Sequence, residues 1–403
     1  MSKEKIIRIC EGTIEWCFYA LLVVATFSIS LVEVAAGVMI AAWLVKTAVS
    51  RDLRFLRSVP VRLIILFFLW TVLSCLNSDY FSESFRGVFS KVAKYSLIFI
   101  IAATSLRKER IIKRTFFVIA ATAVVICANG FFQYFAGFDL IRHRQLISLD
   151  YLRRISSSFV HPNDFGVYLI IVSTVFISFV LSRNSDLKYR ISALIALLFS
   201  LGALFLTKSR GAWISFSAAF LVLGILKSRR MVAVFLAILL VIFVMLPYTA
   251  QERIFSLADL KSGTTWERLM LWKGTINMIK EHPVLGFGIN TYSRNFPKYR
   301  PPDYPDARYS HNCYLHMASE VGIVGALLFL IFLVTVFVYS LMGILRMSVG
   351  PRKSISTGLF AGLVGFSLNC IVDTHLYSVT LAVFFYLLLG FCFSLSRVNP
   401  ADV

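Results

Sequence analysis

WERLMLWKGTINMIKEHPVLGFGIN (residues 266–290) lies in the long polar interval that divides an otherwise apolar sequence. The interval runs from Pro247 to Gly325 and separates a long series of apolar segments from a short one. Long polar segments between buried elements are uncommon and usually carry function. We therefore expect much of any catalytic or binding site to lie in this interval.

The composition is that of a membrane protein. Of the 403 residues, 58% are hydrophobic and only 15% are charged. Soluble domains average roughly 25% charged residues, so we predict an all-α polytopic membrane protein. The formal net charge of +20 would suit nucleic acid, but cationic side chains also gather in cytoplasmic loops and bind anionic head groups. We therefore expect membrane lipids as partners and no nucleic acid.

The sequence offers little to hold a metal. The seven cysteines are scattered without a C-x-x-C pair, so they indicate neither a disulfide framework nor a zinc site. Asp303 and Asp306 lie on a Pro-rich loop, and two carboxylates there make a weak cation site. We expect no metal and no other cofactor.

Segments of about 17 to 25 mostly apolar residues can cross a membrane as helices. By this measure residues 1–403 form one integral membrane domain with about twelve spans, and residues 248–319 form a loop subdomain between the ninth and tenth. The first two spans could instead be one longer unit with a turn at Glu33. The predicted spans are residues 14–32, 34–49, 60–76, 91–106, 112–136, 165–182, 190–207, 211–227, 230–247, 320–345, 355–373 and 376–396.

Lysine and arginine accumulate in alternate connections, which the positive-inside rule assigns to the cytoplasm. With the N-terminus inside, the cytoplasmic segments hold 23 of the 41 Lys and Arg residues. Both termini are then cytoplasmic and the long loop faces outward. The polar segments at residues 77–87, 137–164, 207–211 and 373–375 fall on the same outer side.

Within the loop, residues 264–281 have the pattern of an amphipathic helix. Thr265 can cap its N-terminus, and Leu269, Trp272, Ile276 and Ile279 share a predicted apolar face.

Arg210 stands out because the segment ALFLTKSRGAWISF places it, with Lys208, in a short turn between two apolar runs. A cation at mid-membrane costs about 2.5 to 3.5 kcal/mol on the insertion scale, so it usually meets an anion, a counter-charge or water. We predict a phosphate clamp at the helix N-terminus near Gly211. A side chain that snorkels to a lipid head group is the ordinary alternative.

Arg268 lies in the segment TTWERLMLW, on a helix face that also carries Trp272. A guanidinium there suits a lipid-borne diphosphate, which it can bind with two parallel hydrogen bonds. The alternative is an ion pair with Glu267 or another acid of the loop.

His311, in the segment YSHNCYLH, precedes the tenth span. A histidine titrates near neutrality and can take a proton from a sugar hydroxyl as a general base, with Asn312 as a polar substrate-binding neighbour. His316 follows five residues later, off the same helical face, so no metal pair at i and i+4 is available. A structural histidine is the common alternative.

His161, Pro162, Asn163 and Asp164 form a polar break before the sixth span. At membrane depth such a break needs protein or a water-filled cavity to supply hydrogen bonds. We name His161 and Asn163 as candidate substrate-binding residues, although a helix cap by Asn163 or Asp164 is the simpler interpretation. Asp373 and His375 in the last outer turn could merely end helices.

Four motifs, taken together, resemble the O-antigen ligase and polymerase superfamily. They are F-x-H-P-N at residues 159–163, TKSRGAWIS at 207–215, W-E-R-x3-W-x6-I-x2-H-P-x2-G-x-G-I-N at 266–290, and H-N-x9-G-x2-G at 311–325. The order of the motifs, the twelve spans and the large loop between the ninth and tenth agree with the resemblance along the whole chain. The family resemblance implies a GT-C-like membrane fold.

The resemblance also implies a reaction. Similar proteins are inverting, metal-independent glycosyltransferases of the bacterial inner membrane that act on its periplasmic side. The ligase branch, which we favour, moves undecaprenyl-diphosphate-linked O-antigen to a sugar hydroxyl of the lipid A-core oligosaccharide in lipopolysaccharide biosynthesis. By this resemblance, Arg210 and Arg268 correspond to diphosphate-binding arginines and His311 to the essential histidine.

Other functions stay open on the sequence alone. An O-antigen polymerase uses the same donor with a second lipid-linked glycan as acceptor, and a protein O-oligosaccharyltransferase usually has a longer C-terminal periplasmic region. A lipid-glycan flippase could also place basic residues in a cavity, but such transporters often consist of two repeated halves. The sequence shows no internal repeat.

Overall fold

The computed structural model of the protein describes residues 2–106, 108–149, 152–182, 186–245, 263–302, 304 and 306–397. Within these residues the fold is almost entirely helical, as predicted, and the strands form one two-stranded antiparallel hairpin. The helices are α1 Lys3–Val24, α2 Ile29–Ser50, α3 Val59–Ser74, α4 Phe81–Gly87, α5 Lys94–Ser105, α6 Glu109–Ala136, α7 Pro162–Val180, α8 Leu187–Leu206, α9 Arg210–Lys227, α10 Arg229–Met245, α12 Gly263–Glu281, α13 Tyr292–Asn295, α14 Cys313–Arg346, α15 Pro351–Asn369 and α16 Val379–Ser396.

Shorter elements connect these helices. A π-helical turn, Val88–Ala93, joins α4 to α5, and the hairpin consists of β1 Ile147–Leu149 and β2 Leu152–Arg154. Single 3₁₀ turns occur at Arg54–Arg57, Cys75–Asn77, Phe296–Lys298 and His375–Tyr377.

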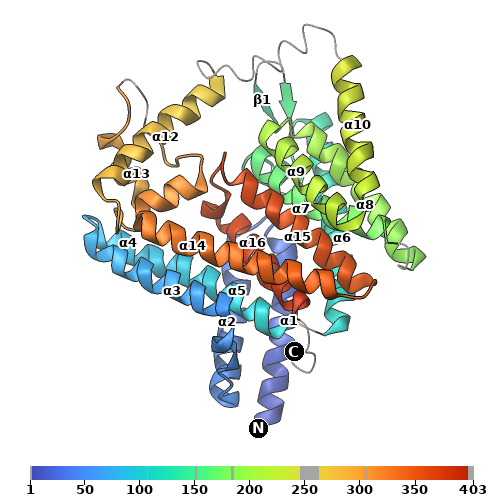
Figure 1. The fold of residues 1–403 in the computed structure, drawn as a ribbon, viewed down its shortest axis with the longest axis horizontal. Helices are drawn as coiled ribbons and strands as arrows, with labels where there is room; N and C mark the ends of the chain where they lie inside the picture. Colours follow the sequence, from blue (N-terminus) through green and yellow to red (C-terminus); the bar gives the residue numbers. More distant parts are fainter. Residues whose placement is uncertain are drawn as a thin grey trace.

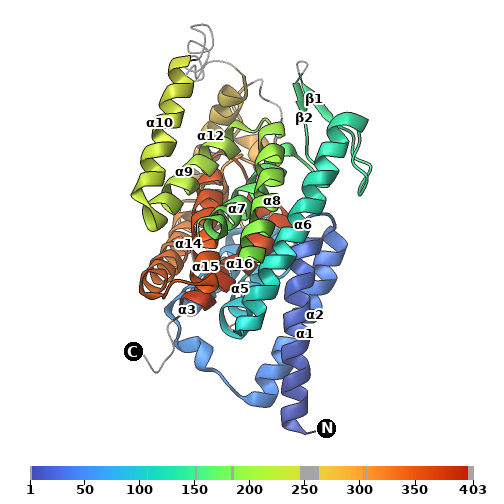
Figure 2. The ribbon, with the colours of Figure 1, turned by 90° about the vertical axis from the view of Figure 1, so that its right-hand side faces the viewer.

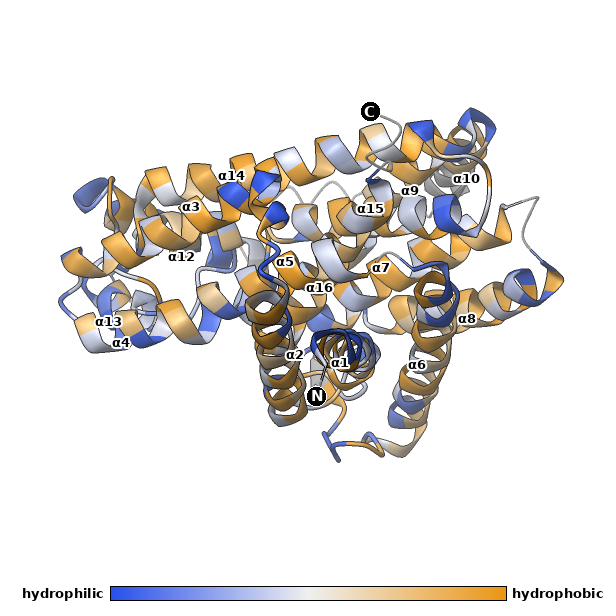
Figure 3. Cartoon of the chain, turned by 90° about the horizontal axis from the view of Figure 1, so that it is seen from below, coloured by the Kyte–Doolittle hydropathy of each residue, from blue (hydrophilic) through white to orange (hydrophobic). Residues whose placement is uncertain are grey.

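The multi-pass character of the chain is confirmed. Each of the twelve predicted spans overlaps a helix or, for residues 91–106, the end of the continuous segment Phe81–Ser105, although the first, residues 14–32, runs past the end of α1 into α2. Of the described segments, nine are long and apolar enough to cross a membrane, and α1, α10 and α15 correspond to the other three predicted spans. Seen from the end that carries the N-terminus, much of the length of the helices consists of hydrophobic residues (Figure 3).

The predicted break at Glu33 is wrong. The first two helices separate at residues 25–28, and Ser28 begins α2 by accepting a hydrogen bond from the Leu31 N–H at 3.3 Å. Glu33 lies inside α2, where its carboxylate is 2.5 Å from the Lys94 ammonium. A local cap therefore sets the boundary, and the acid that suggested a turn has a partner on another helix.

Helices α7, α15 and α16 form the centre of the bundle (Figures 1 and 2). In the 18-residue apolar stretches of α7 and α16, 83% and 89% of the residues are buried, compared with 22% in the corresponding stretch of α2. Small residues allow the close packing of α15 on α7, since a Cβ at Gly362 would lie 2.6 Å from the Ile171 Cα. This contact fixes the ends of α7 and α15 relative to each other, and the candidate site lies at those ends.

The polar interval contains the predicted helix, α12, but its predicted apolar face is only partly buried: Trp272 and Ile279 are half-buried against hydrophobic clusters. Leu271, Thr275 and Met278 are buried, whereas Ile276 is 40% exposed. The reason is a second, small hydrophobic cluster formed within the interval, in which Leu271 and Met278 pack with Phe287, Tyr292 and Phe296. Thr275 lies on this buried face because its hydroxyl is 2.8 Å from the Tyr292 hydroxyl.

Candidate active site

A polar cavity of about 120 Å³ lies where five parts of the chain meet. Strand β2, the start of α7, the α8–α9 turn, α12 and the α15–α16 turn each contribute side chains. The lining residues are Arg154, Asn163, Lys208, Ser209, Arg210, Gly211, Arg268, Asn369, Val372 and Asp373. Of the seven site residues predicted from the sequence, four therefore line one cavity: Asn163, Lys208, Arg210 and Arg268.

Arg210 is the first residue of α9, where the sequence predicted a helix N-terminus. Ser209 caps this helix by accepting from the Ala212 N–H at 3.4 Å, and its hydroxyl donates to the Asn163 side-chain oxygen at 2.9 Å. Since the N-terminal end of a helix carries partial positive charge, α9 adds to the cationic character of the cavity. This arrangement is suited to binding an anion.

Lys208 lies in the turn with a left-handed backbone, φ 51°, which non-glycine residues seldom adopt. Its ammonium is 3.9 Å from the centre of the Phe205 ring, a cation–π contact at the edge of the cavity. The turn therefore holds Lys208 and Arg210 at the same cavity, as their spacing in the sequence suggested.

Arg154 is a cation that our sequence analysis missed. Its guanidinium donates to the Thr207 carbonyl and to the Asn163 side-chain oxygen, both at 3.0 Å. Burial lowers the pKa of Arg154, and the nearby charge of Arg210 lowers it further. An anion bound between the two guanidinium groups would offset the repulsion between their charges. The basic pair at residues 153–154, just before the F-x-H-P-N motif, was the available signal.

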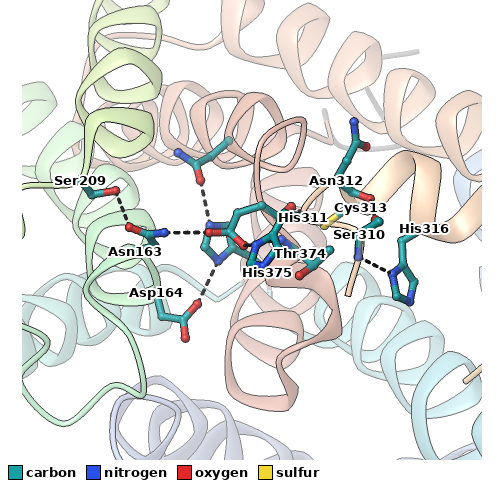
Figure 4. Close-up of polar contacts among 12 residues, drawn as sticks. Asn163, Asp164, Ser209, Ser310, His311, Asn312, Cys313, His316, Thr374 and His375 are labelled. Atoms are coloured by element: carbon teal, nitrogen blue, oxygen red, sulfur yellow. Dashed lines mark hydrogen bonds and ion pairs between the residues drawn. The ribbon is translucent and has the colours of Figure 1, made fainter. Parts of the chain in front are cut away.

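Asn163 connects the cationic side of the cavity to its acidic side. Its amide nitrogen donates to the Asp373 carboxylate at 2.9 Å, while its oxygen accepts from Arg154 and Ser209. The helix-cap interpretation of Asn163 and Asp164 is wrong: α7 begins after His161, and no side chain caps it. Both side chains instead bind groups from elsewhere in the fold, and Figure 4 shows Asn163 between Ser209 and the turn that carries His375.

His311 lies beside the cavity, held by Asp373. The His311 Nδ1 and a carboxylate oxygen of Asp373 are 2.9 Å apart, and the histidine side chain is 46% exposed while the aspartate is 13% exposed. His311 has a left-handed backbone, φ 50°, at the turn before α14. Because an Nδ1–H donated to a carboxylate leaves Nε2 with its lone pair, the contact prepares Nε2 to accept a proton.

Asp373 is a second residue that sequence analysis did not assign to the site. Burial alone would raise the pKa of this carboxyl group, but the charge of His375 and the hydrogen bond from His311 hold it well below the usual range. Asp373 is therefore an anion at neutral pH, and it can both orient His311 and stabilise a proton taken up by it.

His375 lies behind Asp373 and is almost fully buried. One of its ring nitrogens, Nδ1, faces the Asp164 carboxylate at 3.0 Å (Figure 4), and the other, Nε2, faces the Asn369 side-chain oxygen at 2.8 Å. Asn369 is oriented this way because its amide nitrogen donates to the Ser215 hydroxyl at 3.0 Å. Burial lowers the pKa of His375, but Asp373 and Asp164 outweigh this and raise it, which favours an imidazolium.

Three other residues considered from the sequence, His161, Asn312 and His316, do not line the cavity. His161 is exposed at the start of α7 and does not line the cavity. Asn312 caps α14, with its side-chain oxygen accepting from the Tyr314 and Leu315 N–H groups at 2.9 and 3.0 Å. His316 is buried among aromatic rings, with its Nδ1 accepting from the Ser310 N–H at 3.3 Å. Substrate binding by His161 and Asn312 stays a prediction.

Residues 282–290, the H-P-x2-G-x-G-I-N motif, bind the polar interval to α14 near the non-helical residue Gly322. The Phe287 and Gly288 N–H groups donate to the Ser319 and Glu320 carbonyls at 3.0 and 2.8 Å. Gly322 has φ +73°, and a Cβ there would lie 1.8 Å from the Val284 carbonyl oxygen, so only glycine fits. The motif thereby sets where α12, with Arg268, lies relative to the start of α14, with His311.

Metal ligands do not cluster in the part of the chain that the structure describes, where no group of three or more His, Cys, Asp or Glu residues could hold an ion. Of the two acids considered from the sequence, Asp306 is paired with Arg300 at 3.1 Å, and Asp303 lies outside the described residues.

In the comparison with known protein families, residues 195–330 match the family described as O-Antigen ligase. The matched segment is about a third of the chain and contains Lys208, Arg210, Arg268 and His311. The resemblance predicted from the motifs is thus confirmed at the level of the superfamily, with ligase and polymerase branches unresolved. A search among curated proteins found no match.

Proposed function

We propose that this multi-pass membrane protein, whose residues 195–330 match the family described as O-Antigen ligase, is an O-antigen ligase. It would transfer O-antigen from undecaprenyl diphosphate to a sugar hydroxyl of the lipid A core, at the periplasmic side of the inner membrane. The family match supports the coarser statement, an enzyme of the ligase or polymerase type in polysaccharide assembly. The observation that carries the finer proposal is one cavity lined by cations from three elements beside a histidine–aspartate pair.

The cations would bind the diphosphate of the donor. Arg154, Lys208, Arg210 and Arg268 line the cavity, and the N-terminus of α9 opens at it. Guanidinium groups match phosphate oxygens in geometry and charge. Because negative charge develops on the leaving diphosphate as the glycosidic bond breaks, fixed cations at this place stabilise the transition state more than the ground state.

His311 would act on the acceptor. Its Nε2 takes the proton of the sugar hydroxyl while the hydroxyl oxygen attacks the anomeric carbon of the donor sugar. The bond between that carbon and the diphosphate oxygen breaks, and its electron pair leaves with undecaprenyl diphosphate. Asp373 holds Nδ1–H and stabilises the imidazolium that forms, a role carboxylates play beside other catalytic histidines. A single displacement of this kind inverts the anomeric centre.

The energetics agree with a lipid-linked donor. The periplasm contains no nucleotide sugars, so the donor glycan must itself be activated for formation of the new glycosidic bond. A diphosphate is a good leaving group, and the cavity offers cations to receive it. In this proposal the protein supplies positioning and charge, and the donor supplies the driving force.

Deletion of the gene, followed by gel analysis of lipopolysaccharide, tests the proposal. We expect loss of the O-antigen ladder with accumulation of long polymer on undecaprenyl diphosphate, because polymerisation would continue without transfer. Core that still carries a single repeat unit would instead identify a polymerase. An unchanged ladder would contradict both reactions.

A further inference from the structure

A second basic cavity lies at the opposite end of the helices that form the candidate active site. It has a volume of about 410 Å³ and is bounded by the N-terminal ends of α6 and α15 and the C-terminal ends of α14 and α16. Lys113, Arg346, Arg352 and Arg397 line it, with Glu109 as an acid among the lining residues. The cavity therefore has a surplus of positive charge.

The contacts in this cavity divide the cations by role. The Arg352 guanidinium donates to the Leu395 carbonyl at 2.7 and 3.0 Å and so satisfies the C-terminal end of α16. Lys113 is paired with Glu109 at 3.2 Å on the exposed surface of α6. Arg346 ends α14, and Arg397 lies 5.5 Å from the centre of the Phe393 ring. Arg346 and Arg397 have no carboxylate partner among the ion pairs of the described residues.

Two further features favour an anion here. Burial lowers the pKa of the Arg397 guanidinium, which means that its charge has lost solvation. The N-terminus of α15 lies at the cavity with Gly350 before it, and no side chain caps this end. Its first backbone N–H groups lack partners within the helix and add partial positive charge.

The surroundings of the cavity distinguish a lipid from a soluble anion. Met342, Leu345 and Val349, at and just after the end of α14, are 45%, 63% and 65% exposed. Such aliphatic side chains next to a charged cavity match acyl chains next to a head group. Basic pockets between membrane helices are known to bind anionic lipid head groups.

We propose that this cavity binds the phosphate of an anionic glycerophospholipid, with Arg346 and Arg397 as its main ligands and the acyl chains along the outer face of α14. The site is separate from the transfer reaction and does not depend on it.

Titration of the full-length protein in a neutral detergent with short-chain phosphatidylglycerol tests this proposal. We expect a rise in melting temperature that phosphatidylcholine and inorganic phosphate do not give at equal concentration. Arg346→Gln and Arg397→Gln should each weaken the apparent affinity about fivefold, the effect of one cation near a lipid surface. Arg57→Gln, at an exposed arginine that does not line the cavity, is the matched control and should change the affinity less than twofold.

The outcomes separate the alternatives. Equal stabilisation by inorganic phosphate would overturn the assignment to a lipid, and equal weakening by Arg57→Gln would overturn the site. If an arginine variant fails to fold, Ser348→Glu places an acid at the cavity without removing any described contact. That variant should also lose the phosphatidylglycerol shift, and a full shift in it would contradict the proposal.

Discussion

Two cation-rich cavities among the described residues, the candidate active site and the cavity at the ends of α14 and α16, lie at opposite ends of the helix bundle and differ in the partners of their charged side chains. At the candidate active site, the cations share about 120 Å³ with Asn163 and Asp373, which are themselves bound to fixed partners. At the other end, in a cavity of about 410 Å³, Arg352 is bound to a backbone carbonyl and Lys113 to Glu109, while Arg346 and Arg397 are in none of the ion pairs of the described residues. Side chains held by a hydrogen-bond network suit a reaction in which the reacting groups must be oriented. Cations that are not held in ion pairs suit the binding of a lipid head group.

The largest expected effect that would test this contrast is that of His311→Ala. Removal of the proposed base should lower the rate of glycan transfer about a thousandfold or more, toward the upper end of general base catalysis. The measurement is the initial rate with purified protein, lipid-linked O-antigen and lipid A core, at matched amounts of folded protein. Arg57→Gln is the control and should retain the wild-type rate. Wild-type turnover in His311→Ala across neutral pH would remove the base from the mechanism.

A somewhat smaller effect is expected for the arginines of the active site. Arg210→Ala and Arg268→Ala should each lower the rate about a hundredfold to a thousandfold, the scale for loss of one group that stabilises charge in a transition state. Arg210→Lys should recover only part of this loss, because an ammonium cannot form two parallel hydrogen bonds to phosphate. Full attachment of O-antigen to lipid A core in the double alanine variant would contradict the diphosphate clamp.

Asp373→Asn tests whether the carboxylate of Asp373 acts by orienting His311. The amide keeps the size of the side chain but removes the charge that faces His311 and His375. We expect a loss of roughly tenfold to a hundredfold in rate, by analogy with the loss of a carboxylate that orients a metal-bound histidine, because the base His311 itself remains. A positioning role predicts an altered pH–rate profile with little change in the KM for the donor. A variant with an unchanged profile and a raised KM would place Asp373 in donor binding instead.

The smallest effect concerns stability. The pKa of His375 is raised above its ordinary 6.5, so its contribution is fully present below that value and is lost as pH rises through the folded-state pKa. The melting temperature of the wild type should therefore fall as pH rises above about 6.5, and His375→Gln should flatten this fall. Asp373 acts in the opposite direction: its lowered pKa makes its contribution present above the ordinary 3.8 and lost only in strong acid. An equal pH slope in wild type and His375→Gln would contradict the charged state of His375.

Local sequence patterns predicted the residues whose role depends on their own segment. Arg210 lies at a helix N-terminus because TKSRG is a turn between two apolar runs, and both features are visible in the sequence. His311 lies just before α14 for the same kind of reason. The existence of α12 also followed from its pattern, but its buried face followed only in part, because that face is set by Phe287 and Tyr292 from further along the chain.

The membrane helices, the polar interval and the candidate charged residues could be predicted from the sequence, because hydropathy, turn residues and charge are local properties. The hydrogen bond between Asn163 and Asp373, 210 positions apart in the sequence, became visible only in the folded structure. The packing of α7 on α15 brings the start of α7 to the α15–α16 turn, where His375 becomes a buried neighbour of Asp164. The hydrogen bond from Arg154 to Asn163 likewise places Arg154 at the site. Such contacts depend on which helices pack against one another, and in a sequence where nearly every helix is apolar, hydropathy does not choose those partners.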